Sequence, residues 1–229
     1  MKIENITDIF FDLDHTLWDF EKNSELTFAK IFASSHPEVR VKDFIQKYVP
    51  INQACWQLYQ YDKITHEELR YNRLKHSFDA IDYEVTDEQI AILAQDYIDL
   101  LPDNNHLFEG AFEILDYLKQ KYQLHIITNG FADVQDRKIK NSQLQSYFRS
   151  VTNSETAGVK KPNPLIFEHA LQTAKANKSQ SVMIGDSLDA DVEGALKIGL
   201  DAIFFNESNI KVEGHIKQVN HLLELKKYL

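Results

Sequence analysis

The sequence has 229 residues, 43% of them hydrophobic, which is enough apolar material for a substantial core, and its 26% of charged residues is ordinary for a folded protein. Its formal net charge of −10 and the lack of a long basic run argue against a protein that binds a nucleic-acid polymer. The single cysteine, Cys55, excludes an intrachain disulfide framework, and no segment approaches the ~20 apolar residues of a membrane span, so we expect a soluble cytoplasmic protein.

The first predicted element is a buried strand over residues 6–13, where β-branched and aromatic residues run into an Asp-Leu-Asp sequence. From about residue 21 to residue 101 glycine is absent and apolar residues recur at helical spacing, which predicts about four successive helices. Thr65 with Glu68, and Thr86 with Gln89, have the spacing of capping boxes and predict where two of these helices begin.

Beyond Pro102, short apolar strands alternate with helices. We predict a helix over residues 111–121 and a polar helix that follows Asn129-Gly130 and ends at about residue 142. Two more helices are predicted over residues 164–176 and 189–198, the last closed by Gly199. Strands are predicted over residues 124–128, 150–153, 181–184 and 202–205. This alternation predicts an α/β fold with a Rossmann-like, doubly wound parallel sheet. The helical block follows the first strand directly, so we expect a cap of residues 17–103 inserted into a core of residues 1–16 and 104–229.

Reactive side chains gather at the ends of predicted strands and in one loop. Ligands of an open parallel sheet bind beyond the carboxyl ends of its strands, so the fold would bring these segments to one edge. The segments are Asp12-Leu13-Asp14, Thr128-Asn129-Gly130, Lys160-Lys161-Pro162 and Gly185-Asp186-Ser187, with Asp189 and Asp191 close behind.

The residue types in these segments suit phosphoryl transfer. Asp12, Asp14 and Asp186 would make an oxygen-rich site for Mg²⁺, beside which an ionised Asp12 could attack phosphorus. Lys161 would supply a positive charge and Thr128 a hydroxyl for the phosphoryl oxygens. Backbone N–H groups after Asp12 and around Asn129 and Gly130 would hold the remaining oxygens.

Asp14 lies two residues after Asp12, at a point where the chain can turn out of the strand. From there it could protonate the leaving-group oxygen and then deprotonate the water that hydrolyses an aspartyl-phosphate. Each motif alone has an ordinary explanation as a strand end, a turn or a surface charge, and Asp189 is expected to be such a cap or surface residue. Their ordered combination favours phosphoryl chemistry.

The segments DLDHT, IITNG, GVKKPNPLIF and GDSLDAD, in that order, resemble the four signature motifs of the haloacid dehalogenase superfamily. The resemblance covers nearly the whole chain and makes the helical block a type C1 cap. It implies that Asp12 is nucleophile and metal ligand and that Asp14 is the acid–base residue, binding metal through its carbonyl. Thr128 and Lys161 would contact phosphate, Asp186 would bind metal, and Asp191 would support the metal shell. His15 stands where many members have glycine, and we assign it no chemical role.

Asp14 argues against a dehalogenase and for phosphoryl transfer, because dehalogenating members of the superfamily lack this second aspartate. The stretches FFDLDHTLWDF, INQACWQLYQYDKIT and IITNGF are similar to the bacterial pyrimidine 5′-nucleotidase branch. That resemblance implies a Mg²⁺-dependent phosphatase acting on nucleoside 5′-monophosphates. A sugar-phosphate phosphatase or phosphomutase of the same superfamily is the alternative. A non-enzymatic, receiver-like phosphoacceptor module is a remote one, since receiver domains are shorter and accept phosphate on a later strand.

The predicted partner is a small-molecule phosphomonoester, with neither a nucleic-acid polymer nor a membrane involved, and both a monomer and a homodimer are open. The aromatic residues Trp18, Phe20, Trp56 and Tyr59 are candidates for contacting a substrate base, although most aromatic residues on helices belong to a core. The nine histidines show no metal-ligand spacing.

Overall fold

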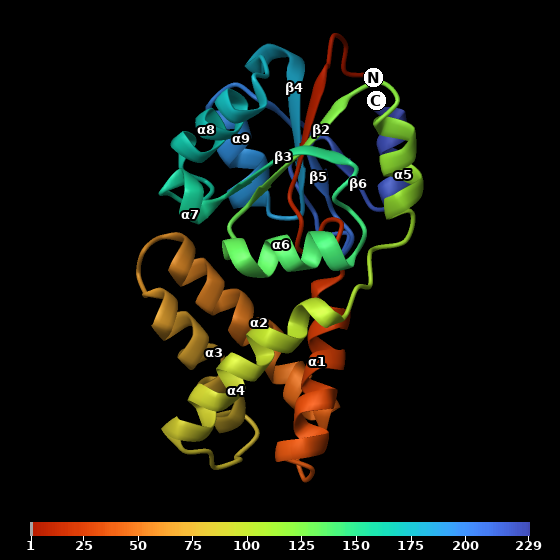
Figure 1. The fold of residues 1–229 in the computed structure, drawn as a ribbon. Helices are drawn as coiled ribbons and strands as arrows, with labels where there is room; N and C mark the ends of the chain where they lie inside the picture. The colour runs from red at the N-terminus through yellow and green to blue at the C-terminus, as the bar shows by residue number, and fades with distance from the viewer. Residues whose placement is uncertain (1) are drawn as a thin grey trace. The chain divides into compact units, whose positions relative to one another are not determined.

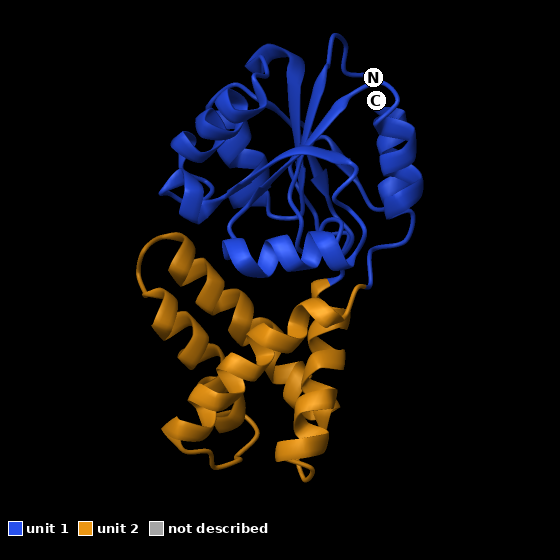
Figure 2. Ribbon diagram, in the orientation of Figure 1, with its two compact units in different colours: residues 1–19, 106–229 blue, residues 20–105 orange. Residues whose placement is uncertain are grey.

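The computed structural model describes residues 2–229 and shows two compact units (Figure 2). One unit comprises residues 1–19 and 106–229, and the other comprises residues 20–105, which interrupt the first along the chain. That residues 17–103 act as a cap stays a prediction. None of the helices formed by residues 2–229 has the length and apolar character needed to span a bilayer.

The larger unit is built on a parallel sheet. Within residues 2–229, six strands pair in the order β3-β2-β1-β4-β5-β6, and each neighbouring pair is parallel. The strands are β1 Asp8–Phe11, β2 Gln123–Thr128, β3 Phe148–Asn153, β4 Ser181–Gly185, β5 Asp201–Phe205 and β6 Gln218–Val219. The chain builds outward from β1 to β3 and then returns to place β4 on the other side of β1. This order confirms the predicted Rossmann-like α/β class.

Helices cover both faces of the sheet, with α8 and α9 on one side and α5 on the other (Figure 1). Phe10, Met183 and Phe204 share a buried cluster with Phe167 of α8, because alternate strand residues point to the same face. The helices of this unit are α5 Ala111–Leu118, α6 Ala132–Asn141, α7 Ser154–Ala157, α8 Pro164–Ala174 and α9 Gly194–Lys197. A 3-10 helix, Leu222–Lys227, follows β6.

The helix predicted over residues 189–198 is not continuous. A π-helical segment, Leu188–Glu193, precedes the short α9. The carbonyl of Ser187 accepts hydrogen bonds from Asp191 N at 3.0 Å and from Val192 N at 3.2 Å, which widens the turn. Asp191 Oδ2 also accepts a hydrogen bond from Ser187 N at 3.0 Å. The wide turn therefore goes with an Asp191 side chain that folds back over the start of the segment. The two-residue strand β6 was too short for its pattern to predict.

Residues 20–105 form a helical unit with the helices α1 Phe20–Ser35, α2 Val41–Gln60, α3 His66–Asp79 and α4 Asp87–Leu100. The predicted succession of four helices is confirmed, and both capping boxes are present at Thr65 and Thr86. The core of this unit is aromatic. The ring centroid of Phe28 lies 4.8 Å from that of Phe44 and 4.7 Å from those of Tyr48 and Tyr97. The buried rings are Phe28, Phe32, Phe44, Tyr48, Phe78 and Tyr97. Cys55 is a buried residue of α2.

Candidate active site

The predicted site segments meet at one edge of the sheet. Strand β1 lies between β2 and β4, in register with both. Asp12 follows β1, Thr128 ends β2, and Asp186 follows β4, so all three lie at carboxyl ends of adjacent strands. The edge is also where the strand order reverses, which is the place where open α/β sheets bind ligands.

Lys161 lies between two carboxylates. Its Nζ is 2.5 Å from Asp12 Oδ1 and 2.6 Å from Asp191 Oδ1, and it donates a further hydrogen bond of 2.8 Å to the carbonyl of Ile127. Burial lowers the pKa of Lys161, but Asp12 and Asp191 together raise it above its usual value. This side chain is 2% exposed, so its charge is fixed in place rather than shared with solvent.

Asp191 reaches Lys161 only because Gly185 has no side chain. A Cβ at Gly185 would lie 2.2 Å from Asp191 Oδ2, closer than real contacts allow. Asp191 is 1% exposed and holds both Lys161 and the backbone of Ser187. These contacts hold the Asp191 carboxylate beside Asp12 and Asp186.

Three carboxylates crowd together at this edge. Oxygen atoms of Asp12, Asp186 and Asp191 lie within 4.8 Å of one another. Burial raises the pKa of Asp12 well above its usual value, Lys161 opposes this, and the charges of Asp191, Asp186 and Asp14 add to it. Burial and the charge of Asp191 raise the pKa of Asp186 to about 8. A divalent cation would relieve this repulsion, and carboxylate oxygens are ligands that Mg²⁺ prefers, so the residues present fit such an ion.

Thr128 and Asn129 are tied to neighbouring segments. Thr128 Oγ1 accepts hydrogen bonds from Gln135 Nε2 at 2.7 Å and from Gly130 N at 3.1 Å. The Asn129 side chain accepts from Lys161 N at 2.7 Å and donates to the carbonyl of Lys161 at 3.0 Å. This two-way bond joins the second and third motifs. The predicted backbone contact of Asn129 with phosphate stays a prediction.

The chain turns sharply after Asp12, as expected. His15 has φ of 61°, in the left-handed region that favours glycine, which accounts physically for the glycine of the commoner motif. Leu17 and Trp18 both donate backbone hydrogen bonds to the carbonyl of Leu13, at 3.0 and 2.8 Å. The turn brings Thr16 Oγ1 to 3.2 Å from Asp186 Oδ1.

The carboxylate of Asp14 is turned toward α6 rather than toward the other acids. Its Oδ1 lies 2.6 Å from Lys138 Nζ, and its Oδ2 accepts a hydrogen bond of 2.8 Å from Gln135 Nε2. Lys138 also lies 4.3 Å from the ring centroid of Trp18, which is fully buried. A contact between Trp18 and a substrate base stays a prediction.

Neither Gln135 nor Lys138 was among the residues predicted from the sequence. In the structure, these two polar residues, three positions apart, share the buried face of α6 with Val134 and Ile139. An uninterrupted packing face would have apolar residues at all four positions.

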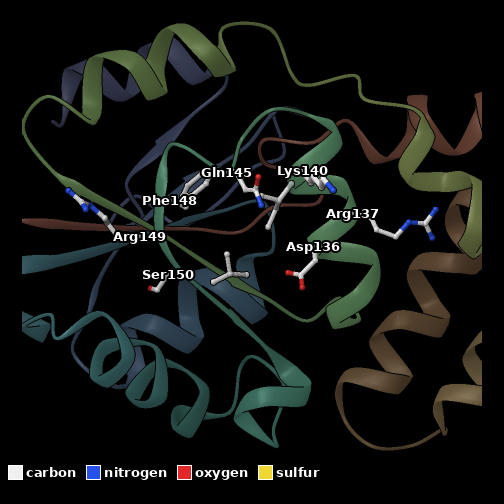
Figure 3. Close-up of a pocket in the computed structure, with 9 residues that line it drawn as sticks. Asp136, Arg137, Lys140, Gln145, Phe148, Arg149 and Ser150 are labelled. Atoms are coloured by element: carbon white, nitrogen blue, oxygen red, sulfur yellow. The ribbon is translucent and has the colours of Figure 1, made fainter.

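A separate hollow of about 390 Å³ lies between α6 and β3 (Figure 3). None of the predicted site residues is among those that line it. Arg137 and Arg149 point away from one another, so their charges do not converge on one position (Figure 3). The lining residues are Asp136, Arg137, Ile139, Lys140, Gln145, Phe148, Arg149, Ser150 and Val151.

The chain is similar to a known protein family and to several known proteins. Residues 9–205 match the family model of haloacid dehalogenase-like hydrolases. The pyrimidine 5′-nucleotidase PynA of Streptococcus pneumoniae is 32% identical over 205 residues, covering 89% of this chain and 85% of that protein. The pyrimidine 5′-nucleotidase YjjG of Escherichia coli is 30% identical over 199 residues, covering 86% and 85%.

A crystal structure of the putative HAD-hydrolase YfnB of Bacillus subtilis, bound to magnesium, superposes with a TM-score of 0.87 at 27% identity and covers 98% of both chains. The match to the family model spans the sheet from β1 to β5, and with it all four motif segments. The chain therefore belongs to the haloacid dehalogenase-like hydrolase family.

Proposed function

We propose that this protein is a Mg²⁺-dependent phosphatase that hydrolyses nucleoside 5′-monophosphates, preferentially those of pyrimidines. The observation that carries the proposal is the arrangement of Asp12 at the strand-order reversal, with Lys161 at 2.5 Å, Asp186 beside it and a second acid, Asp14, two residues on. The nucleotide preference rests on the similarity to two proteins named as pyrimidine 5′-nucleotidases.

In the first step, a carboxylate oxygen of Asp12 forms a bond to phosphorus as the ester P–O bond breaks, which leaves an aspartyl-phosphate. Lys161 and the Thr128 hydroxyl stabilise charge on the phosphoryl oxygens. Mg²⁺, held by Asp12, Asp186 and the carbonyl of Asp14, would supply the positive charge that keeps Asp12 ionised beside its acidic neighbours. Asp191 would keep Lys161 in place through their 2.6 Å ion pair.

Asp14 would serve both halves of the reaction. As an acid it gives its proton to the leaving nucleoside oxygen, and as a base it takes a proton from the water that hydrolyses the aspartyl-phosphate. A dehalogenase forms an ester on its aspartate without needing to protonate a leaving alkoxide. The presence of an acid at position 14 therefore favours phosphate esters over halogenated acids.

The test is a phosphate-release screen with Mg²⁺ over pyrimidine and purine 5′-monophosphates, hexose and pentose phosphates and a triose phosphate. Pyrimidine nucleotides should give the highest kcat/KM, and chelation of the metal should abolish release. Asp12→Asn should eliminate turnover without unfolding the chain, whereas Asp189→Asn, an acid outside the proposed ligand set, should retain it. Sugar phosphates far ahead of nucleotides would refute the nucleotide assignment, and interconversion of hexose phosphate isomers without release would indicate a mutase.

A further inference from the structure

Lys138 on α6 is a buried cation that the proposed reaction does not yet use. Its side chain is 3% exposed, and it contacts Asp14 at 2.6 Å and the Trp18 ring at 4.3 Å. Lysine is rarely buried to this degree, because removing an ammonium from water is unfavourable unless the group is paired. Apolar residues of similar volume commonly replace buried ion pairs with no loss of stability, so the pair needs a reason other than folding.

Gln135 makes a second contact from the same helix face. Its Nε2 donates to Asp14 Oδ2 at 2.8 Å and to Thr128 Oγ1 at 2.7 Å, and so it connects the predicted acid–base residue with a predicted phosphate-binding residue. Among residues 2–229, no hydrogen-bond partner is found for Gln135 Oε1, although this atom is buried. The opposite amide orientation would place Oε1 against the Asp14 carboxylate. The observed orientation, in which Nε2 binds both Asp14 and Thr128, therefore leaves Oε1 without a partner.

Gly130 provides the space for this arrangement. A Cβ at position 130 would lie 2.3 Å from Gln135 Nε2 and 2.5 Å from Gln135 Cδ. The glycine of the second motif therefore lets the Gln135 side chain cross over the motif loop to reach Asp14. This steric observation is independent of the Lys138–Asp14 ion pair, and it concerns a second contact with the same Asp14 carboxylate.

We propose that Lys138 and Gln135 are positioning residues that hold the carboxylate of Asp14 in one orientation for proton transfer. Each binds a different oxygen of Asp14, so together they fix the rotation of the carboxylate as well as its position. The Asp14 side chain is 20% exposed, so these contacts do not close it off from solvent. This inference rests on the proposed phosphatase function, in which Asp14 is the acid–base residue.

Leaving-group dependence distinguishes positioning from a structural role. An alkoxide leaving group, as in a nucleotide, needs a proton from Asp14, whereas p-nitrophenolate is stable without one. The ratio kcat/KM reports the steps up to phosphorylation of Asp12. Lys138→Met should therefore lower kcat/KM for a pyrimidine nucleotide about 100-fold, at the lower end of general acid–base contributions, and change the value for p-nitrophenyl phosphate by less than about threefold.

A double-mutant cycle with Asp14→Asn gives the sharper test. If Lys138 acts through Asp14, then adding Lys138→Met to Asp14→Asn should lower kcat/KM no further. Gln135→Met should likewise lower kcat/KM for the nucleotide more than for p-nitrophenyl phosphate. It replaces Lys138→Met in the test if thermal unfolding shows that Lys138→Met does not fold. Lys140→Met, a cation on the exposed side of the same helix, is the matched control and should leave both substrates unaffected.

Equal losses on both substrates, or losses that add to those of Asp14→Asn, would overturn the positioning role. So would wild-type rates for both Lys138→Met and Gln135→Met. If the wild-type protein releases phosphate from neither substrate, the proposed function itself fails and this inference fails with it. That result differs from an active wild-type protein whose α6 variants show no leaving-group split.

Discussion

Lys161 Nζ lies 2.5 Å from Asp12 Oδ1 and at the same time 2.6 Å from Asp191 Oδ1, so one buried cation neutralises two buried carboxylates. The three groups come from the end of β1, from the loop before α8 and from the π-helical segment after β4. One lysine, through two ion pairs, thus connects segments that follow different strands of the sheet.

Replacing Lys161 should affect both stability and catalysis. Lys161→Met leaves Asp12 and Asp191 without their shared cation, and we expect a loss of about 3–5 kcal/mol in the free energy of unfolding and no measurable phosphate release. Urea unfolding of Lys160→Met, the neighbouring lysine, provides the control and should change little. Adding Asp191→Asn to Lys161→Met should recover part of the lost stability. No loss on removing Lys161 would contradict the ion-pair account.

Removing a carboxylate from the acidic cluster should weaken the metal site. Asp186→Asn lowers the negative charge facing the proposed Mg²⁺ position, and we expect the Mg²⁺ concentration for half-maximal activity to rise at least about tenfold. Asp189→Asn removes the same charge from the adjacent turn and should leave the Mg²⁺ titration unchanged. Identical titrations for the wild-type protein and Asp186→Asn would remove Asp186 from the ligand set.

A methyl group at position 130 should disturb the contacts of Gln135. Because the added Cβ would meet Gln135 Nε2 at 2.3 Å, Gly130→Ala must displace the glutamine from Asp14 and Thr128. Overpacking of this kind costs about 1–3 kcal/mol, and we expect nucleotide hydrolysis to fall more than p-nitrophenyl phosphate hydrolysis. Gly214→Ala is a suitable control, since a Cβ there has nothing within 4 Å. Equal thermal stability of both variants would argue against the close contact.

A histidine inside the sheet should make stability depend on pH. His125 is buried on β2, with Nε2 3.1 Å from Asp8 Oδ1 and Nδ1 2.8 Å from Ser150 Oγ. Burial lowers the pKa of His125 below the usual 6.5, and Asp8 opposes this only in part. The unfolded chain therefore binds more protons at this residue, so its contribution to stability is fully present above the unfolded pKa of about 6.5 and is lost as the pH falls from there through the lower pKa of the folded state.

The measurement is the free energy of urea unfolding between about pH 7.5 and pH 5. His125→Gln should flatten the decline toward low pH, whereas His215→Gln, at an exposed position, should retain it. A decline of the same size in the His125 variant would assign the pH dependence to other groups.

Several features were predictable from the sequence because they depend on residues close together in the chain. The capping boxes at Thr65 and Thr86 each involve residues three positions apart, and both are present. The strand before Asp12 was identified from its continuous apolar run. Parallel strands that alternate with helices place their carboxyl ends at one edge, so the meeting of Asp12, Thr128 and Asp186 followed from the order of the elements.

Other features were decided only by tertiary packing. Lys138 and Asp14 are 124 positions apart, and their contact depends on which face of α6 packs against the turn after β1. Helical periodicity marked a polar helix but did not show that Gln135 and Lys138 point inward, because local propensity carries no information about the partner surface. The wide turn at Leu188–Glu193 likewise depends on Asp191 folding back to Ser187. The sequence by itself thus determined the fold class and the residues brought to the sheet edge, while packing between distant segments decided which side chains hold them in position.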